Sequence, residues 1–290
     1  MKLVTFERDG QVRVGEWDAA QNTVCPLAFA DGEPVYSMLG LIQASVAGEV
    51  VVAGDAQSLD DARLLAPLPR PERNIFCVGK NYHAHAEEFA RSGFDAGRQI
   101  NDAIPAAPIV FTKAPETVIA HGETIWAAEG VTDALDYEAE LAVIIGQGGR
   151  GIARADAMKH VFGYTIINDV TARDWQKRHQ QWFLGKSFDT FAPMGPALVT
   201  ADEVDGAILE LRCHVNGELR QHANTRDMIF DIPTLIEILS AGITLYPGDI
   251  IATGTPEGVG IGFQPPRFLR RGDRVRIEIQ GIGVLENTIG

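Results

Sequence analysis

The segment LDYEAELAVIIGQGG, residues 135–149, places two glutamates directly before a run of five apolar residues. That run, residues 141–145, is apolar at every position, which is typical of a strand buried on both faces. Successive side chains of a strand point to opposite faces, so Glu138 and Glu140 share one face, with Cα atoms roughly 6.5 to 7 Å apart. A strand that enters the protein interior therefore begins with two carboxylates that point the same way.

Such a pair alone is more often the solvated face of a strand, but a third acid favours a site. A second segment, VFGYTIIND, also ends its apolar run with a carboxylate, Asp169. Three carboxylates brought together without a cation would repel one another and raise one another's pKa. Because hard divalent ions prefer oxygen ligands, we expect Glu138, Glu140 and Asp169 to bind Mg²⁺, Mn²⁺ or Ca²⁺ rather than Zn²⁺.

The composition is that of an ordinary globular protein. The 290 residues are 46% hydrophobic and 22% charged, and the formal charge of -14 disfavours binding to nucleic acid or to anionic membranes. No apolar run approaches about 18 residues, and the first residues resemble two strands rather than a signal peptide, so we expect a cytoplasmic protein. The three cysteines, Cys25, Cys77 and Cys213, form neither a zinc pattern nor a disulfide framework.

A proline-rich connector divides the chain. Residues 64–74, LLAPLPRPERN, carry three prolines that can continue neither a helix nor a central strand. Before it, the strand-like MKLVTFER and QVRVGEW and the helix-like VYSMLGLIQASVAG predict a small α/β domain, residues 1–68. After it, residues 69–290 predict a second, larger domain.

The larger domain is rich in short β-type runs, among them NIFCVG, PIVFTK, APMGPALVT, ILELRCHV and RVRIEIQ. The sequence VNGE at 215–218 predicts a two-residue hairpin turn. Helix-like pieces such as TARDWQKRHQ and DIPTLIEILSAG stand between the strands without regular βαβ alternation. The expected fold class is therefore mainly β with α (α+β), in two mostly antiparallel layers.

A second reactive cluster lies in YHAHAEEFARSG, which follows the strand NIFCVG. On a helix, His85 and Glu88 lie at i and i+3, and His83 and Glu87 at i and i+4, so either pair can touch. A surface helix with local ion pairs is the plainer interpretation of one such pair. A carboxylate that fixes the tautomer of an imidazole, however, makes the ring a competent general base.

These blocks together resemble the fumarylacetoacetate hydrolase family. The resemblance covers about residues 73 to 290 and rests on the ordered series VGKNYHAHAEE, DYEAELAVIIG, NDVTARDWQ, FLGKSFDTFAPMGP, VNGELRQ and GDIIATGTPEGVG. It implies the family's mixed β-sandwich or roll, a homodimer, and a divalent metal held by Glu138, Glu140 and Asp169. The small amino-terminal domain is similar to one that many members carry.

The resemblance also implies roles for side chains of the site. The family's H-x-x-E pattern is matched by His85 with Glu88, which would activate water, and not by His83 with Glu87. Lys186 and Gln176 would stabilise an oxyanion. Arg173 would bind a substrate carboxylate or, equally, form a structural salt bridge.

Two further segments are candidates for contact with the substrate. The turn Thr253, Gly254 and Thr255 offers backbone N–H groups to an anion, although a simple glycine-rich loop is the alternative. Residues 90–107 are polar, glycine-containing and longer than a connector requires, so we expect a lid that excludes water. A pocket for the substrate tail would draw on Trp175, Trp182 and Phe183, whereas core packing is the more common role of such residues.

The function expected first is a metal-dependent hydrolase that cleaves a C–C bond in acylpyruvates or related 1,3-diketo acids. It would release pyruvate or another 2-oxo acid, in the catabolism of aromatic or related compounds. Alternatives on the same site are decarboxylation of oxaloacetate and isomerisation or hydration of unsaturated 2-oxo dicarboxylates. A binding protein without catalysis ranks last, because the metal ligands and the base are all present in the sequence.

Overall fold

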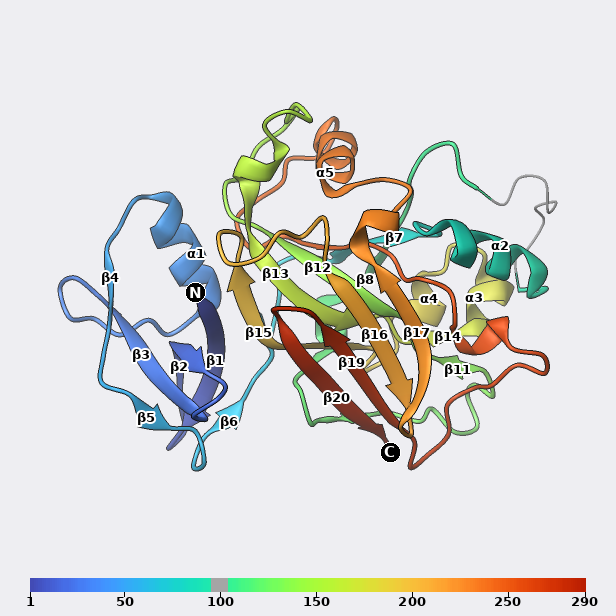
Figure 1. The fold of residues 1–290 in the computed structure, drawn as a ribbon, viewed down its shortest axis with the longest axis horizontal. Coiled ribbons are helices and arrows are strands. Elements are labelled where there is room, and N and C mark those ends of the chain that lie inside the picture. The colour runs from blue at the N-terminus through green and yellow to red at the C-terminus, as the bar shows by residue number, and fades with distance from the viewer. Residues whose placement is uncertain (95–103) are drawn as a thin grey trace.

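The computed structural model describes residues 1–94 and 104–290 and is built around one large sheet (Figure 1). Its strand order is β4-β3-β2-β1-β15-β13-β12-β18-β7-β8, with β5, β6 and β9 paired to single strands beside this path. The first four strands of that order come from the N-terminal segment, drawn in blue, and the other six from the rest of the chain. The two parts meet where β1 pairs antiparallel with β15.

The N-terminal part consists of short strands and one helix. Their bounds are β1 (Lys2–Arg8), β2 (Gln11–Asp18), β3 (Thr23–Phe29), α1 (Met38–Val46), β4 (Val51–Ala53), β5 (Gln57–Ser58) and β6 (Arg63–Leu64). Ser37 begins α1 because its side chain accepts the N–H of Gly40. The sheet thus continues across the predicted boundary at residues 68 and 69, which stays a prediction.

The remaining strands of the large sheet carry the apolar runs of the sequence. They are β7 (Ile75–Gly79), β8 (Ile109–Lys113), β9 (Val118–Ile119), β12 (Ala139–Ile145), β13 (Val161–Asn168), β15 (Ala192–Thr200) and β18 (Ile250–Ala252). All seven residues of β12 are buried, as expected for a strand that enters the interior.

A second, five-stranded sheet covers one face of the first. It consists of β10 (Thr124–Ile125), β16 (Glu210–Val215), β17 (Glu218–Asn224), β19 (Arg274–Ile279) and β20 (Gly283–Ile289). The predicted hairpin joins β16 to β17, and Asn216 and Gly217 both have the positive φ of its turn. A short pair, β11 (Leu135–Asp136) and β14 (Thr171–Ala172), lies beside the two sheets. The predicted class, mainly β with α, is confirmed.

The helices stand at the edges of the sheets. They are α2 (His83–Arg91), α3 (Arg173–His179), α4 (Phe183–Lys186) and α5 (Ile232–Ser240), with 3₁₀ turns η2 (Pro115–Thr117), η3 (Ala157–His160), η4 (Thr225–Asp227) and η5 (Gly260–Gly262). In Figure 1, α2, α3 and α4 gather at one end of the large sheet. None of the helices in the described part of the chain is long and apolar enough to span a membrane.

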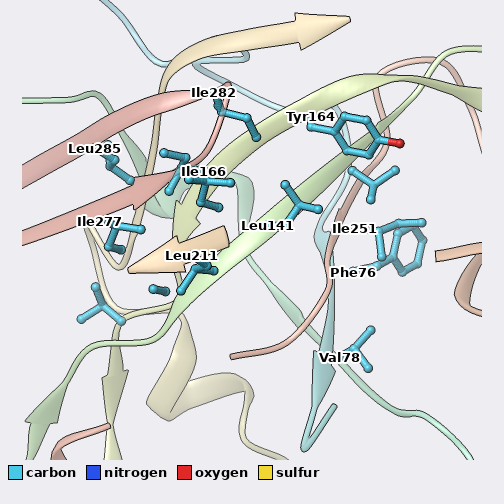
Figure 2. Close-up of a cluster of buried hydrophobic side chains, with 14 of the residues drawn as sticks. Phe76, Val78, Leu141, Tyr164, Ile166, Leu211, Ile251, Ile277, Ile282 and Leu285 are labelled. Carbon is cyan, nitrogen blue, oxygen red and sulfur yellow. The ribbon is translucent and has the colours of Figure 1, made fainter. Parts of the chain in front are cut away.

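The main core lies between the two sheets (Figure 2). From β12, Leu141 belongs to it together with Ile166 of β13 and Leu211 of β16. The alternate residues Ala142 and Ile144 point to the opposite face and join the cluster that packs around α1. By the same alternation, Glu138 and Glu140 fall on this second face, away from the five-stranded sheet.

The register between β12 and β13 positions the predicted acids. The strands are antiparallel and pair Ala139 with Asn168, so the beginning of one lies against the end of the other. The N–H of Asp169 then donates to the backbone carbonyl of Glu138 at 2.9 Å. Residues 31 positions apart in the chain are thereby neighbours in space, which explains how acids at opposite strand ends converge.

Candidate metal centre and active site

Three carboxylates converge where β12 begins and β13 ends. Each of Glu138, Glu140 and Asp169 contributes an oxygen to a group whose members all lie within 4.8 Å of one another, and all three side chains are buried. The N–H of Gly254 donates to Oε2 of Glu140 at 2.8 Å and fixes that side chain. The structure therefore brings together the three acids that the sequence predicts as metal ligands.

Two buried lysines hold Asp169 from opposite sides. Lys186 lies in the last turn of α4, and its Nζ is 2.7 Å from Oδ2 of Asp169 and 2.8 Å from Oε2 of Glu138. Lys113 ends β8, and its Nζ donates to Oδ1 of Asp169 at 2.7 Å, to the carbonyl of Val170 at 3.0 Å and to the carbonyl of Lys186. Lys186 thus lies at the site as predicted, and Lys113 is an addition to it.

Arg173, at the start of α3, is fully buried. Its Nη1 is 2.6 Å from Oε1 of Glu138, and its Nε donates to Oδ2 of Asp136 at 2.8 Å. Gln176, one turn later, accepts a hydrogen bond from Nη1 at 3.2 Å. Arg173 therefore takes the structural salt-bridge role left open by the sequence, while substrate contact by Arg173 and Gln176 stays a prediction.

These neighbours move the pKa values of the two glutamates in opposite directions. Burial opposes ionisation of Glu138, but the charges of Lys186 and Arg173 outweigh it and lower the pKa of Glu138 to about 2. Burial raises the pKa of Glu140 well above its ordinary value, and the negative charges of Asp169 and Glu138 raise it further. The cluster thus contains one carboxylate that is difficult to ionise until a cation compensates it.

The donor set fits a hard divalent cation. Four buried carboxylates, those of Asp136, Glu138, Glu140 and Asp169, face three buried cations, Lys113, Arg173 and Lys186. With all four carboxylates ionised, these seven groups carry one net negative charge, which a divalent ion would convert into one net positive charge. Oxygen-only ligands select Mg²⁺, Mn²⁺ or Ca²⁺, and a net positive centre favours an anionic substrate.

The structure distinguishes between the two histidine–glutamate pairs of α2. His85 is buried, and its Nδ1 lies 3.1 Å from Oε2 of Glu88, whereas His83 and Glu87 are both exposed. His85 also lies close enough to Glu138 for its charge to contribute to the lowered pKa of that acid. With Nδ1 held by Glu88, Nε2 is the ring nitrogen available for proton transfer. The arrangement is the one that the H-x-x-E spacing predicts, and its catalytic role stays a prediction.

The turn formed by Thr253, Gly254 and Thr255 is hydrogen-bonded to β12, the strand that carries Glu140. Both threonine hydroxyls donate to backbone carbonyls of β12, those of Leu141 and Ala139, and the Gly254 N–H binds the Glu140 carboxylate. The anion that this turn holds is therefore a side chain of the protein. A direct contact of the turn with substrate stays a prediction.

The three aromatic candidates separate in space. Trp182 packs against Phe89 of α2 and Phe111 of β8, with ring centroids 6.0 and 5.3 Å away, so it lies beside the His85 helix. Trp175 packs against Phe188. Phe183 is exposed. Of the predicted lid, residues 95–103 lie outside the described part of the chain.

Comparisons with known proteins identify the family. The family model described as fumarylacetoacetate (FAA) hydrolase C-terminal matches residues 74–290, three quarters of the chain. The protein belongs to this family, as the ordered blocks of its sequence predict.

The chain is also similar to individual named relatives and solved structures of this family. The chain is 55% identical over 234 residues, 80% of its length and 75% of the relative's, to "Oxaloacetate tautomerase YisK" of Bacillus subtilis. It is similar in structure to a fumarylacetoacetate hydrolase from Exiguobacterium antarcticum, with 41% identity, a TM-score of 0.83 and coverage of 100% and 99% of the two chains. A 2-hydroxyhepta-2,4-diene-1,7-dioate isomerase from Mycobacterium marinum matches with 35% identity, a TM-score of 0.76 and coverage of 100% and 98%.

Replacement of Glu140 by Gln tests the metal centre. The substitution keeps the shape of the side chain and removes a ligand charge, so the affinity for Mn²⁺ should fall by at least about 10-fold. Isothermal titration with Mn²⁺ measures it, and Glu129→Gln at an exposed ion pair with Arg271 is the control. An affinity equal to wild type in Glu140→Gln would remove this residue from the ligand set.

The pH dependence of cation binding follows from the raised pKa of Glu140. A proton on this carboxylate must leave before the oxygen can bind a cation, so binding should release protons into solution. Affinity should therefore rise as the pH rises through the raised pKa, and fall as the pH drops below it. Titration in buffers of different ionisation enthalpy counts the released protons. Binding without proton release, and with equal affinity from pH 5 to 8, would contradict the shift.

Proposed function

We propose that the protein is a divalent-metal-dependent tautomerase of a 2-oxo dicarboxylate of the oxaloacetate type. The observation that carries the proposal is the position of the His85–Glu88 pair, with a buried imidazole and a partly buried carboxylate, near a cluster of three carboxylates that could hold a metal ion. Support also comes from the 55% identity to a relative named as an oxaloacetate tautomerase and from the similarity to a dienedioate isomerase. Keto and enol tautomers differ in the position of one proton and one double bond. Ketonisation therefore adds a proton to carbon while the enol oxygen gives its proton up to solvent, which requires acid–base groups and no attacking water.

The chain's own residues suit this proton transfer. Glu138, Glu140 and Asp169 would hold a divalent cation, which would supply a Lewis acid for the 2-oxo acid group of the substrate. His85 would deliver a proton to the carbon next to the keto group, or remove it in the reverse direction. Glu88, 3.1 Å from Nδ1, holds the imidazole in one tautomer and orientation.

Lys186 would act at the oxygen of the enol. Burial disfavours the charged form of this lysine, but Asp169 and Glu138 outweigh it and raise its pKa above the ordinary value. The side chain is therefore a fixed ammonium group, a suitable partner for an oxygen on which negative charge develops. The second carboxylate of the substrate is attracted by the net positive charge of the loaded centre.

Hydrolysis of a C–C bond, the reaction expected first from the sequence, is the second candidate. The structural similarity to a protein named fumarylacetoacetate hydrolase favours it, and the His85–Glu88 pair suits activation of water as well as proton transfer. The names of the relatives favour the tautomerase and isomerase class over it.

Following the family resemblance, we propose further that the protein works as a homodimer in the cytoplasm.

An assay of enol-oxaloacetate distinguishes the candidates. Ketonisation lowers the ultraviolet absorbance of the enol, and the protein with Mg²⁺ should accelerate this decay, whereas excess EDTA should abolish the acceleration. His85→Ala should lower kcat on the order of 100-fold or more, because the general acid–base group is lost. His83→Ala, the same change at an exposed position of the same helix, is the matched control and should cost far less.

Three results would overturn parts of the proposal. Equal losses in His85→Ala and His83→Ala would mean that the ring is assigned wrongly. A higher kcat/KM for an acylpyruvate, with ¹⁸O from solvent water in the released carboxylic acid, would replace the tautomerase with the hydrolase. Release of CO₂ from oxaloacetate as the faster reaction would replace it with a decarboxylase.

A further inference from the structure

The segment GVGIG, residues 258–262, has glycine at every second position, and we call it the glycine segment. A Cβ atom on Gly258 would lie 1.9 Å from the carbonyl oxygen of Arg220, and one on Gly260 would lie 2.6 Å from Oδ1 of Asp136. A Cβ atom on Gly262 would lie 1.8 Å from Oε1 of Glu88. All three distances are too short for real contacts, so each glycine permits a close approach that no other residue allows.

The backbone of the glycine segment holds two carboxylates of the site. The N–H of Gly258 donates to Oε1 of Glu88 at 2.9 Å. The N–H groups of Gly260 and Ile261 donate to Oδ1 and Oδ2 of Asp136 at 2.6 and 3.2 Å. Asp136 binds Arg173, which in turn binds the metal ligand Glu138, so one short segment contacts both halves of the site.

We propose that Gly262 is a positioning residue for the His85–Glu88 pair. Its missing side chain allows the Glu88 carboxylate to lie against the backbone, with Oε1 on the N–H of Gly258 and Oε2 3.1 Å from Nδ1 of His85. Two oxygens fixed by two different partners allow the carboxylate a single orientation. This inference rests on the proposed role of His85 and names a residue on which that role depends.

The surroundings of Gly262 indicate that substitution there acts through Glu88. The three nearest atoms to an added Cβ are Oε1, Cδ and Cγ of Glu88, at 1.8, 2.3 and 2.7 Å. Gly262 is exposed, and its φ lies outside the left-handed region, so the backbone itself accepts alanine. A pocket of about 340 Å³, lined by Glu88, Gly262 and Arg91 among others, gives the displaced carboxylate room to turn toward solvent and away from His85.

Gly262→Ala tests the proposal, with Gly242→Ala as the matched control. Gly242 is also exposed and free of left-handed φ, and an added Cβ meets no atom within 4 Å. With enol-oxaloacetate and Mg²⁺, Gly262→Ala should lower kcat at least about 10-fold, a part of the loss expected on removal of the general base. KM and Mn²⁺ affinity should stay near wild type, and Gly242→Ala should match wild type throughout.

A double-mutant cycle with Glu88→Gln shows whether Gly262 acts through Glu88. If it does, Gly262→Ala should cause no further loss of kcat in the Glu88→Gln background, because coupled residues are not additive. Wild-type kcat in Gly262→Ala, an undiminished second loss in the double variant, or loss of Mn²⁺ affinity together with kcat would each overturn the assignment. Full activity of Glu88→Gln alone would instead refute the proposed role of the acid–base pair.

Discussion

The structure depends on the pairing of charges that are buried at one end of the large sheet. Removing one partner of a buried ion pair costs about 3 to 5 kcal/mol, because the other charge stays in the interior without compensation. Here the charges alternate in sign along a chain of contacts in which each ion touches the next. Its members are, in order, Lys113, Asp169, Lys186, Glu138, Arg173 and Asp136.

Glu140 is the exception to this pairing. Its carboxylate accepts a hydrogen bond from Gly254 but has no direct ion-pair partner among the described residues. Burial and the adjacent charges of Asp169 and Glu138 raise its pKa, and a divalent cation would offset that repulsion. On this account the ion-pair chain would hold the predicted ligands in place before a cation arrives, and Glu140 would couple cation binding to proton release.

Local patterns in the sequence predict the carboxylate pair of β12, the hairpin and the His85–Glu88 contact, because each depends on spacing within one element. Glu138 and Glu140 share a face by strand alternation, and His85 and Glu88 meet by helical spacing. Lys113 and Gly262 escaped notice, because their roles arise from contacts 56 and 174 positions away, with Asp169 and Glu88. For Lys113, the only local sign in the sequence is that this lysine ends the apolar run PIVFTK. Reaction type was equally beyond local pattern, since one site suits both hydrolysis and tautomerisation.

Crystals of the protein grown with Mn²⁺ and oxalate provide the most direct test of the central claim, that the three acids hold a catalytic cation. Oxalate stands in for the 2-oxo acid end of the substrate. The account predicts one anomalous peak per chain, within roughly 2.0 to 2.6 Å of oxygens from Glu138, Glu140 and Asp169, with oxalate on its open side. An anomalous peak elsewhere, with Lys186 still bridging Glu138 and Asp169 and no density between the three carboxylates, would contradict it.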